Sequence, residues 1–106
     1  MDSLAVDVAT MRDSAEAVAE LLRIMAHPER LMVLCQLTQG EVGVGQLQQH
    51  SALSQSAFSQ HLTVLRKQGF IKARKESQLV FYSLADPRIA TLIMNLQDLF
   101  CPTDDR

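Results

Sequence analysis

The stretch Ser54-Gln-Ser-Ala-Phe-Ser-Gln-His-Leu-Thr-Val-Leu-Arg-Lys-Gln-Gly69 is the most informative part of this chain. Phe58, Leu62 and Leu65 recur at helical spacing and give the segment one apolar face. Ser54 is a good N-terminal cap, because its hydroxyl can accept a hydrogen bond from a first-turn amide. Gly69 stands where a C-terminal cap belongs. The pattern therefore predicts a capped helix between Ser54 and Gly69.

The face opposite these apolar residues carries short amide and hydroxyl groups and no charge: Gln55, Ser56, Ser59, Gln60 and Thr63. Such groups both donate and accept hydrogen bonds, as base edges in the major groove of DNA require. Basic side chains follow at the helix end, where they can hold phosphates. We therefore expect this helix to bind DNA through Ser54, Gln55, Ser56, Ser59, Gln60, His61, Arg66 and Lys67.

The preceding segment completes a known arrangement of two helices. Val44–His50 has the pattern of a short helix, and Ser51–Ser54 is a tight turn into the longer one. Two helices joined by three or four residues form a helix-turn-helix, whose second helix enters the groove. On spacing alone, two ordinary packed helices with a polar outer face remain the alternative.

The next segment, Phe70–Leu84, predicts two short strands around a polar turn, because Val80, Tyr82 and Leu84 alternate as a half-buried strand does. The turn lacks the Gly that a two-residue hairpin prefers, so the sequence leaves its geometry open. A helix-turn-helix followed by a basic hairpin is a winged helix. We expect the wing to reach DNA through Arg74, Lys75 and Gln78.

The net charge of −2 argues superficially against DNA binding, but the charge is unevenly distributed. Residues 1–20 carry −4, residues 21–50 are neutral, residues 51–85 carry +4 and residues 86–106 carry −2. The positive excess falls on the end of the predicted recognition helix and on the hairpin. These are the places where phosphates should lie.

The length of 106 residues suits one domain over residues 1–106. We expect residues 1–13 to be a loose extension or the start of the first helix, and residues 102–106 to be a flexible tail. No apolar run of about 18 residues would span a membrane, and the acidic N-terminus does not resemble a signal peptide. We therefore expect a cytoplasmic protein without a membrane partner. No Cys-x-x-Cys, catalytic constellation or phosphate loop favours an enzyme.

Amphipathic helices are predicted at both ends, over residues 14–25 and 87–100, with Asp86 as the cap of the second and Pro87 in its first turn. A further helix begins at Pro28 and is apolar nearly all round, which predicts a central, buried position. The terminal helices exceed what one small winged helix needs to cover, although they could simply close the monomer core. We expect a homodimer, which doubles the DNA site, with an interface at Val18, Leu22, Ile89, Leu92, Ile93 and Leu96.

These segments resemble the ArsR/SmtB-type winged-helix repressors of bacteria. The resemblance is carried by Met25-Ala-His27-Pro28-Glu-Arg30-Leu31, by Ser54-x-Ser56-x-x-Ser59-Gln60-His61-Leu62-x-x-Leu65-Arg66, by Gly69-Phe70-Ile71 and by Tyr82-Ser-Leu84. It covers the chain from about Ser14 to Phe100. The resemblance implies a mainly helical winged helix-turn-helix in the order of four helices, two strands and one helix. It also implies a homodimer that binds an imperfect inverted repeat in double-stranded DNA and is released by an inducer.

Many members of this family sense metals through a Cys-x-Cys motif within Glu-Leu-Cys-Val-Cys-Asp-Leu. The matching residues here are Glu41-Val-Gly43-Val-Gly45-Gln-Leu47, with glycine in place of both thiols. A second family site uses Asp and His on the last helix, but Pro87–Phe100 contains no His. Zinc needs about four ligands, and His27, His50 and His61 lie on separate elements. We therefore expect no metal and no cofactor, with a metal-sensing repressor as the alternative.

Two cysteines remain, Cys35 in the helix after Pro28 and Cys101 at the end of the last helix. Singly, they would be a small buried hydrophobe and an idle thiol. As a pair, in Leu31-Met-Val-Leu-Cys35-Gln-Leu37 and Leu99-Phe-Cys101-Pro102, they resemble the dithiol subgroup that senses persulfides and redox state. The resemblance implies a small sulfur or oxidant inducer that links Cys35 and Cys101. The sequence does not say whether they are close enough for a plain disulfide.

Other functions stay open at this point. A regulator of the same family with an unknown inducer could act by displacing another repressor. A protein-interaction module could use the winged helix as a scaffold, although the basic hairpin argues against it.

Overall fold

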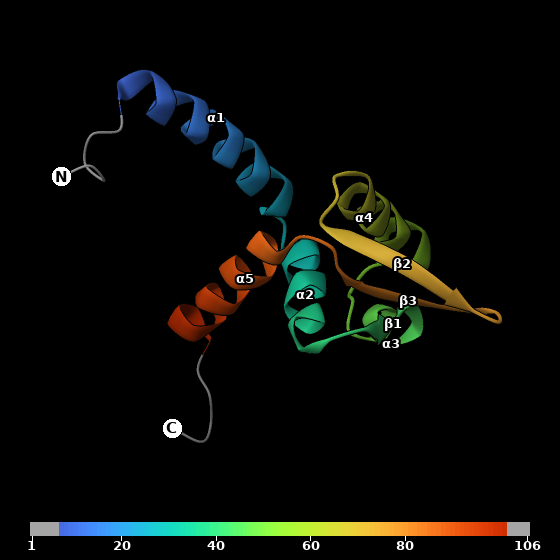
Figure 1. The fold of residues 1–106 in the computed structure, drawn as a ribbon. Helices are drawn as coiled ribbons and strands as arrows, with labels where there is room; N and C mark the ends of the chain where they lie inside the picture. The colour runs from blue at the N-terminus through green and yellow to red at the C-terminus, as the bar shows by residue number, and fades with distance from the viewer. Residues whose placement is uncertain (1–6, 102–106) are drawn as a thin grey trace.

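A computed structural model describes residues 7–101 and has the predicted architecture, a mainly helical winged helix-turn-helix with a small antiparallel sheet (Figure 1). The elements follow in the order α1 (Val8–Met25), α2 (Pro28–Gln36), the short 3-10 turn η2 (Leu37–Gln39), β1 (Val42–Gly43), α3 (Val44–Gln49), α4 (Gln55–Lys67), β2 (Ile71–Glu76), β3 (Leu79–Leu84) and α5 (Pro87–Phe100). The helix-turn-helix and the hairpin of the wing are thereby confirmed. Within the described residues, no helix combines the length and apolar character needed to cross a bilayer.

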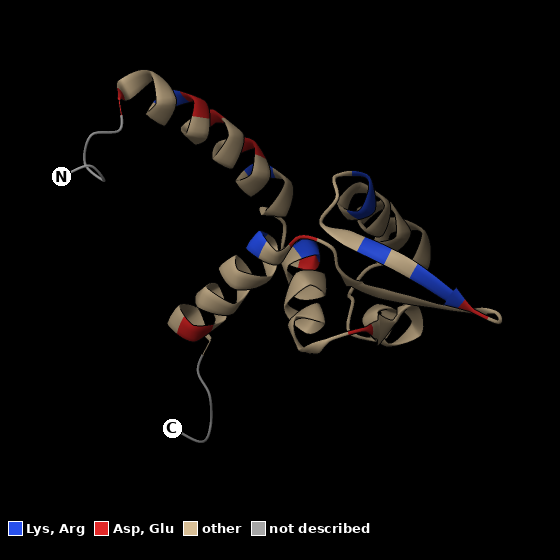
Figure 2. Cartoon of the chain, viewed as in Figure 1, with Lys and Arg blue, Asp and Glu red and all other residues tan. Residues whose placement is uncertain are grey.

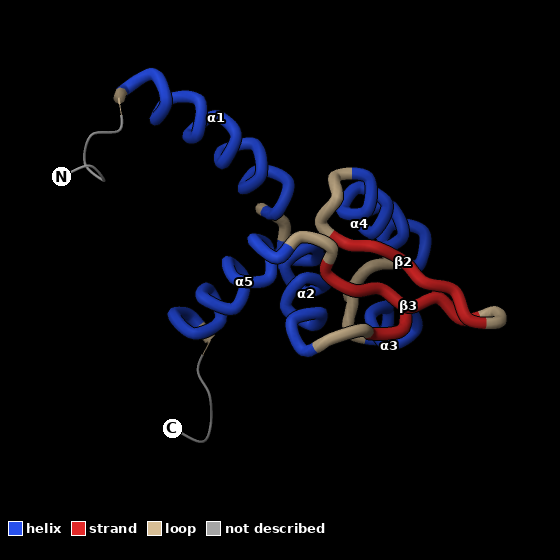
Figure 3. The backbone as a smooth tube through the Cα atoms, viewed as in Figure 1, coloured by secondary structure: helices blue, strands red, loops and turns tan. Residues whose placement is uncertain are grey.

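The sheet has three strands in the order β1-β3-β2, one more than the sequence predicted (Figure 3). Strand β1 pairs Val42 with Tyr82, and two residues are too few to show a strand periodicity. The long hairpin pairs β2 with β3, and only Ser77 and Gln78 lie between the strands. Ser77 has φ 58, the left-handed conformation that Gly usually supplies in such turns. The wing is therefore a tight hairpin despite the missing Gly.

The core is a single cluster beneath α4, the predicted recognition helix. Its buried members come from every helix, from β2 and β3, and from the residue before β2: Met25, Val33, Leu34, Leu37, Leu47, Phe58, Leu62, Leu65, Phe70, Ile71, Tyr82, Ile89 and Ile93. The helix α2 packs against both α4 and α5, so its predicted central position is confirmed. It is not covered all round, because Met32 stays 46% exposed.

The helix α1 points away from this body and reaches it only with its C-terminal end (Figure 1). It begins at Val8, and the Asp7 carboxylate caps it by accepting a hydrogen bond from the Thr10 amide at 2.8 Å. Residues 8–13 are thus the start of the first helix, and the alternative of a loose extension is wrong for them. Residues 1–6 and the predicted tail 102–106 lie outside the described residues.

Candidate DNA-binding surface and thiol cavity

The predicted recognition helix, α4, is capped at both ends as its sequence predicts. The Ser54 hydroxyl accepts a hydrogen bond from the Ala57 amide at 3.2 Å. At the other end, the Gly69 amide donates to the Arg66 carbonyl at 3.0 Å, and the Phe70 amide donates to the Leu65 carbonyl at 2.9 Å. Gly69 has φ 80, and the two hydrogen bonds together form a Schellman motif, a helix ending that favours glycine. It turns the chain sharply, buries Phe70 and begins β2 directly afterwards.

The outer face of α4 is a free polar surface. The side chains predicted to meet DNA here are exposed at Ser54, Gln55, Ser56, Ser59, Gln60, Arg66 and Lys67. Within residues 7–101, no hydrogen bond engages the side chains of Gln55, Ser56 or Gln60. Figure 2 shows basic residues at the end of α4 and along β2, whereas α1 carries both acidic and basic residues. The arrangement offers uncharged donors and acceptors flanked by positive charge, as base reading with phosphate contacts requires.

His61 differs from the other predicted DNA-binding residues of α4, because its ring is half-buried against α2. Its Nδ1 accepts a hydrogen bond from Nε of Arg30 at 3.1 Å, and its ring centroid lies 4.2 Å from that of His27. Burial lowers the pKa of His61, and the nearby His27 and Arg30 lower it further. These effects favour the neutral ring, in which Nδ1 can accept the hydrogen bond from Arg30. The predicted contact of His61 with DNA stays a prediction.

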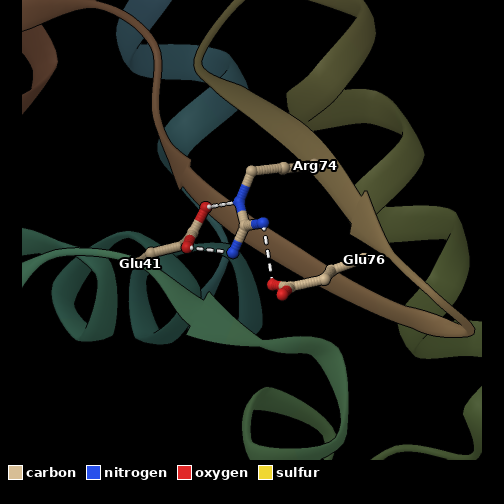
Figure 4. A network of polar contacts seen from close by, with 3 residues as sticks. All are labelled: Glu41, Arg74 and Glu76. Carbon is tan, nitrogen blue, oxygen red and sulfur yellow. Dashed lines mark hydrogen bonds and ion pairs between the residues drawn. The ribbon is translucent and has the colours of Figure 1, made fainter.

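The wing holds its two predicted phosphate-binding cations in different surroundings. The Arg74 guanidinium donates to both Glu41 oxygens at 2.8 Å and to Glu76 at 3.0 Å, as Figure 4 shows. It also lies 4.9 Å above the Phe81 ring, and the hydrogen bond from Arg74 lowers the pKa of Glu41. Lys75 forms no ion pair among the described residues. Arg74 is thus neutralised by local carboxylates, whereas Lys75 is free to meet a phosphate.

Both thiols line one cavity of about 320 Å³ between α2 and α5. Apart from the cysteines, its walls are mostly apolar: Leu31, Ile93, Leu96, Gln97 and Phe100. Cys35 is half-buried and Cys101 is exposed. Burial raises the pKa of Cys35, a hydrogen bond from Gln97 lowers it in part, and the charge of Cys101 raises it again. The fold therefore brings together two cysteines that are distant in sequence.

Metal ligands are not gathered in the part of the chain that the structure describes. Residues 7–101 hold no group of three or more His, Cys, Asp or Glu side chains placed to bind an ion. The close approach of the tilted His27 and His61 rings is nevertheless a contact that the sequence did not predict. No periodicity links these two positions, so no signal in the sequence could have revealed it.

The predicted dimer-interface residues divide into two sets. Val18 and Leu22 on α1 are 50% and 46% exposed, and Leu92 and Leu96 on α5 are half-buried. Ile89 and Ile93 are 0% exposed within the single chain, so their prediction as interface residues is wrong. They belong to the monomer core, because α5 turns this side of its wide apolar stripe toward α2. Further exposed apolar side chains, which the prediction omitted, are Val8, Met11, Met32, Leu79, Met94, Leu99 and Phe100.

Comparison with known proteins gives a consistent set of relatives. The family model "Bacterial regulatory protein, arsR family" matches residues 27–73. The chain is 46% identical over 90 residues to "Transcriptional activator HlyU" of Vibrio cholerae, which covers 85% of this chain and 82% of that protein. It is 42% identical over 95 residues to "Biofilm growth-associated repressor" of Agrobacterium fabrum, covering 90% of this chain and 81% of that protein. The crystal structure of the transcriptional repressor BigR from Xylella fastidiosa superposes with a TM-score of 0.81 at 37% identity, covering 92% of this chain and 100% of that one.

Proposed function

Since this chain belongs to the arsR family of bacterial regulatory proteins and is a transcriptional regulator, we propose that it is a homodimeric repressor with a thiol switch. The dimer binds an imperfect inverted repeat in double-stranded DNA. A persulfide, polysulfide or oxidant links Cys35 to Cys101 and releases the DNA. The observation that carries the switch is the cavity lined by both cysteines. Because its target is chromosomal DNA, we place the protein in the cytoplasm.

The exposed face of α4 recognises the base sequence of the DNA. Gln55, Ser56, Ser59 and Gln60 contact base edges in the major groove, and Ser54 lies beside them at the helix start. The basic and polar side chains around them hold the backbone: Arg66, Lys67, Arg74, Lys75 and Gln78. Among these, Lys75 contributes more than Arg74, whose charge two carboxylates already balance.

Dimerisation follows from the apolar side chains that α1 leaves uncovered. Val18 and Leu22 gain little from the fold of one chain, and a partner subunit would remove them from water. Leu92 and Leu96 extend this surface along α5. Two recognition helices held about 34–36 Å apart then meet successive major grooves on one side of the DNA.

The linking reaction balances as two thiol exchanges. The exposed Cys101 thiolate attacks the outer sulfur of a persulfide R–S–SH, forming Cys101–S–SH and releasing R–S⁻. The Cys35 thiolate then attacks the Cys101 sulfur, forming the Cys35–Cys101 disulfide and releasing HS⁻. The two thiolates are oxidised and the persulfide is reduced. If further persulfides insert their outer sulfur, each lengthens the bridge by one sulfur atom and leaves R–SH.

A covalent bridge would tie α2 to the end of α5. Because α2 packs directly against α4, a small displacement of α2 moves α4. A loss of about 3 kcal/mol weakens DNA binding roughly 100-fold, so a modest change in register is sufficient for release.

The test uses an operator selected from random duplexes with the reduced wild-type protein. Glutathione persulfide should release the wild type and should leave Cys35→Ser and the double Cys35→Ser, Cys101→Ser variant bound. Intact mass should show the loss of two hydrogens for a disulfide or added sulfur atoms for a longer bridge. Release of the double variant as readily as the wild type contradicts the thiol switch. If a stoichiometric metal releases both proteins instead, the family's metal-sensing function applies.

The direction of regulation is tested separately, because the relatives include an activator and a repressor by name. Transcript levels next to the selected operator should rise when the gene for this protein is deleted. A fall would indicate that the protein acts by displacing another repressor.

A further inference from the structure

The joint between α1 and α2 is built around one arginine. The chain turns at Ala26, where α1 ends, and the His27 Nδ1 caps α2 by accepting a hydrogen bond from the Glu29 amide at 3.0 Å. Nη1 of Arg30 donates to the Ile24 carbonyl at 2.9 Å. That carbonyl is one of the last in α1, where helical partners run out. Arg30, in the first turn of α2, thus holds the end of α1 through a hydrogen bond.

The same side chain is also hydrogen-bonded to α4. Nε of Arg30 donates to Nδ1 of His61 on α4 at 3.1 Å. The His61 ring is held from a second side by His27, with ring centroids 4.2 Å apart and planes inclined at 41°. Arg30 is therefore bonded at one end to α1 and at the other to α4.

A third contact holds the turn of the helix-turn-helix to the same end of α2. The Glu29 carboxylate accepts hydrogen bonds from the Ser51 hydroxyl at 2.9 Å and from the Ala52 amide at 3.4 Å. The Ser51 hydroxyl in turn accepts from the Leu53 amide at 3.0 Å. The turn before α4 and the middle of α4 are both hydrogen-bonded to the first turn of α2, so we expect the helix-turn-helix to move together with this turn.

A guanidinium suits this position because its donors lie in one rigid plane. Nε and Nη1 point in fixed, different directions, so their two acceptors are held at a fixed mutual angle. A lysine ammonium has the same charge but no such plane, and it can satisfy one acceptor while leaving the other. Arg30 is half-buried, so water replaces a lost bond poorly.

We propose that Arg30 sets the angle between α1 and α4, and thereby the half-site spacing that the dimer accepts on DNA. The inference rests on the proposed function, since it takes the molecule to be a DNA-binding dimer assembled through α1. The rest of α1 projects away from the body, so the joint is where this angle is decided. Arg30 is a positioning residue and touches no base.

The length of α1 makes the angle consequential. Its 18 residues span about 27 Å at 1.5 Å per residue. A rotation of about 10° at the joint therefore displaces the far end by ~5 Å, more than the rise of about 3.4 Å per base pair. A loosened joint should allow several spacings that a rigid one rejects.

The experiment measures affinity against spacing. Random duplexes selected with wild-type protein give the paired half-sites, and a series of duplexes then lengthens or shortens the spacer by one and two base pairs. We expect the wild type to lose about 10-fold or more in affinity for each wrong spacer. Arg30→Lys should bind the best spacer more weakly and should discriminate among spacers less than about 3-fold. Arg23→Lys is the matched control, because Arg23 is exposed on α1 and pairs with Glu20 of the same helix.

A second pair of variants tests the joint if Arg30→Lys does not fold. His61→Gln keeps an acceptor for Arg30 and should retain the spacer preference, whereas His61→Leu should lose it. The inference is overturned if Arg30→Lys, or His61→Leu, weakens binding equally on all spacers and keeps the wild-type ratio. A wild type that selects no paired half-sites overturns the proposed dimeric function, and this inference with it.

Discussion

The helices α1 and α4 differ in how much of their apolar surface is buried within the chain. The 13 residues of α4 bury Phe58, Leu62 and Leu65 within the chain, whereas Met25 is the buried residue of the 18 in α1. Most of the stability of a helix in a protein comes from packing its apolar face. The helix α4 is therefore packed within the chain, whereas α1 leaves apolar side chains uncovered, which is where we propose that a partner subunit binds.

The polar faces differ as well. The outer face of α4 is uncharged and ends in Arg66 and Lys67, whereas α1 carries both acidic and basic residues, with a small acidic excess (Figure 2). Phosphates are attracted to the first surface, whereas α1 has no positive excess that would attract them. In the proposed function, α4 therefore faces DNA and α1 faces a partner subunit.

The largest expected effect comes from the buried face of α4. Phe58→Ala removes a fully buried ring, and the free energy of unfolding should fall by about 3–5 kcal/mol, measured by denaturant titration at fixed protein concentration. Met11→Ala on α1 should change it far less in the monomeric chain. Equal losses from both variants would break the contrast between the two helices.

The next effect concerns the exposed stripe of α1. Leu22→Asp places a charge where we expect an apolar contact, so the dimer dissociation constant should rise about 100-fold, equivalent to about 3 kcal/mol. Ala17→Asp adds the same charge on the opposite face of α1 and should leave the dimer intact. Sedimentation measures both variants. An unchanged dimer in Leu22→Asp would remove α1 from the interface.

A smaller effect is expected on the outer face of α4. Gln60→Ala should weaken operator binding by about 1–3 kcal/mol, because it removes a bidentate donor and acceptor from the groove. Binding to random duplex should hardly change. Equal weakening on both DNAs, measured by titration at one salt concentration, would show that this face does not read sequence.

The two cations of the wing should differ in how much they contribute to the salt dependence of DNA binding. Lys75→Ala should lower the slope of log affinity against log salt by about one. Arg74→Ala should lower it less, because Glu41 and Glu76 already balance its charge. If the two variants changed the slope equally, the carboxylate pairing of Arg74 would have no bearing on DNA binding.

The smallest effect is a pH dependence that arises from the inner side of α4. The pKa of His61 is lowered in the folded chain, chiefly by burial and further by His27 and Arg30, while Glu29 opposes the shift. The unfolded chain therefore takes up this proton more readily, and stability is lost as pH falls below the ordinary pKa of 6.5. His61→Gln, which keeps an acceptor for Arg30, should flatten the free energy of unfolding between pH 7 and pH 5. An identical pH profile would exclude His61 as the titrating group.

Local signals in the sequence were sufficient for the elements that carry the proposed function. The caps at Ser54 and Gly69 act on amides and carbonyls a few residues away, and the Asp86 carboxylate accepts from the Arg88 amide at 2.9 Å. Such short-range bonds, with the helical spacing of Phe58, Leu62 and Leu65, predict α4 and α5 without knowledge of their neighbours.

Local patterns in the sequence are sufficient to place the helices and the hairpin and to identify the polar face of α4. How these elements pack against one another follows only from the folded structure. It buried Ile89 and Ile93 rather than exposing them, left Met32 uncovered and added β1. It also joined Arg30 to His61 across 31 positions and Arg74 to Glu41 across 33. Capping and periodicity act within a turn or two of one segment. Contacts between distant segments depend instead on the geometry of the whole fold, which no local pattern contains.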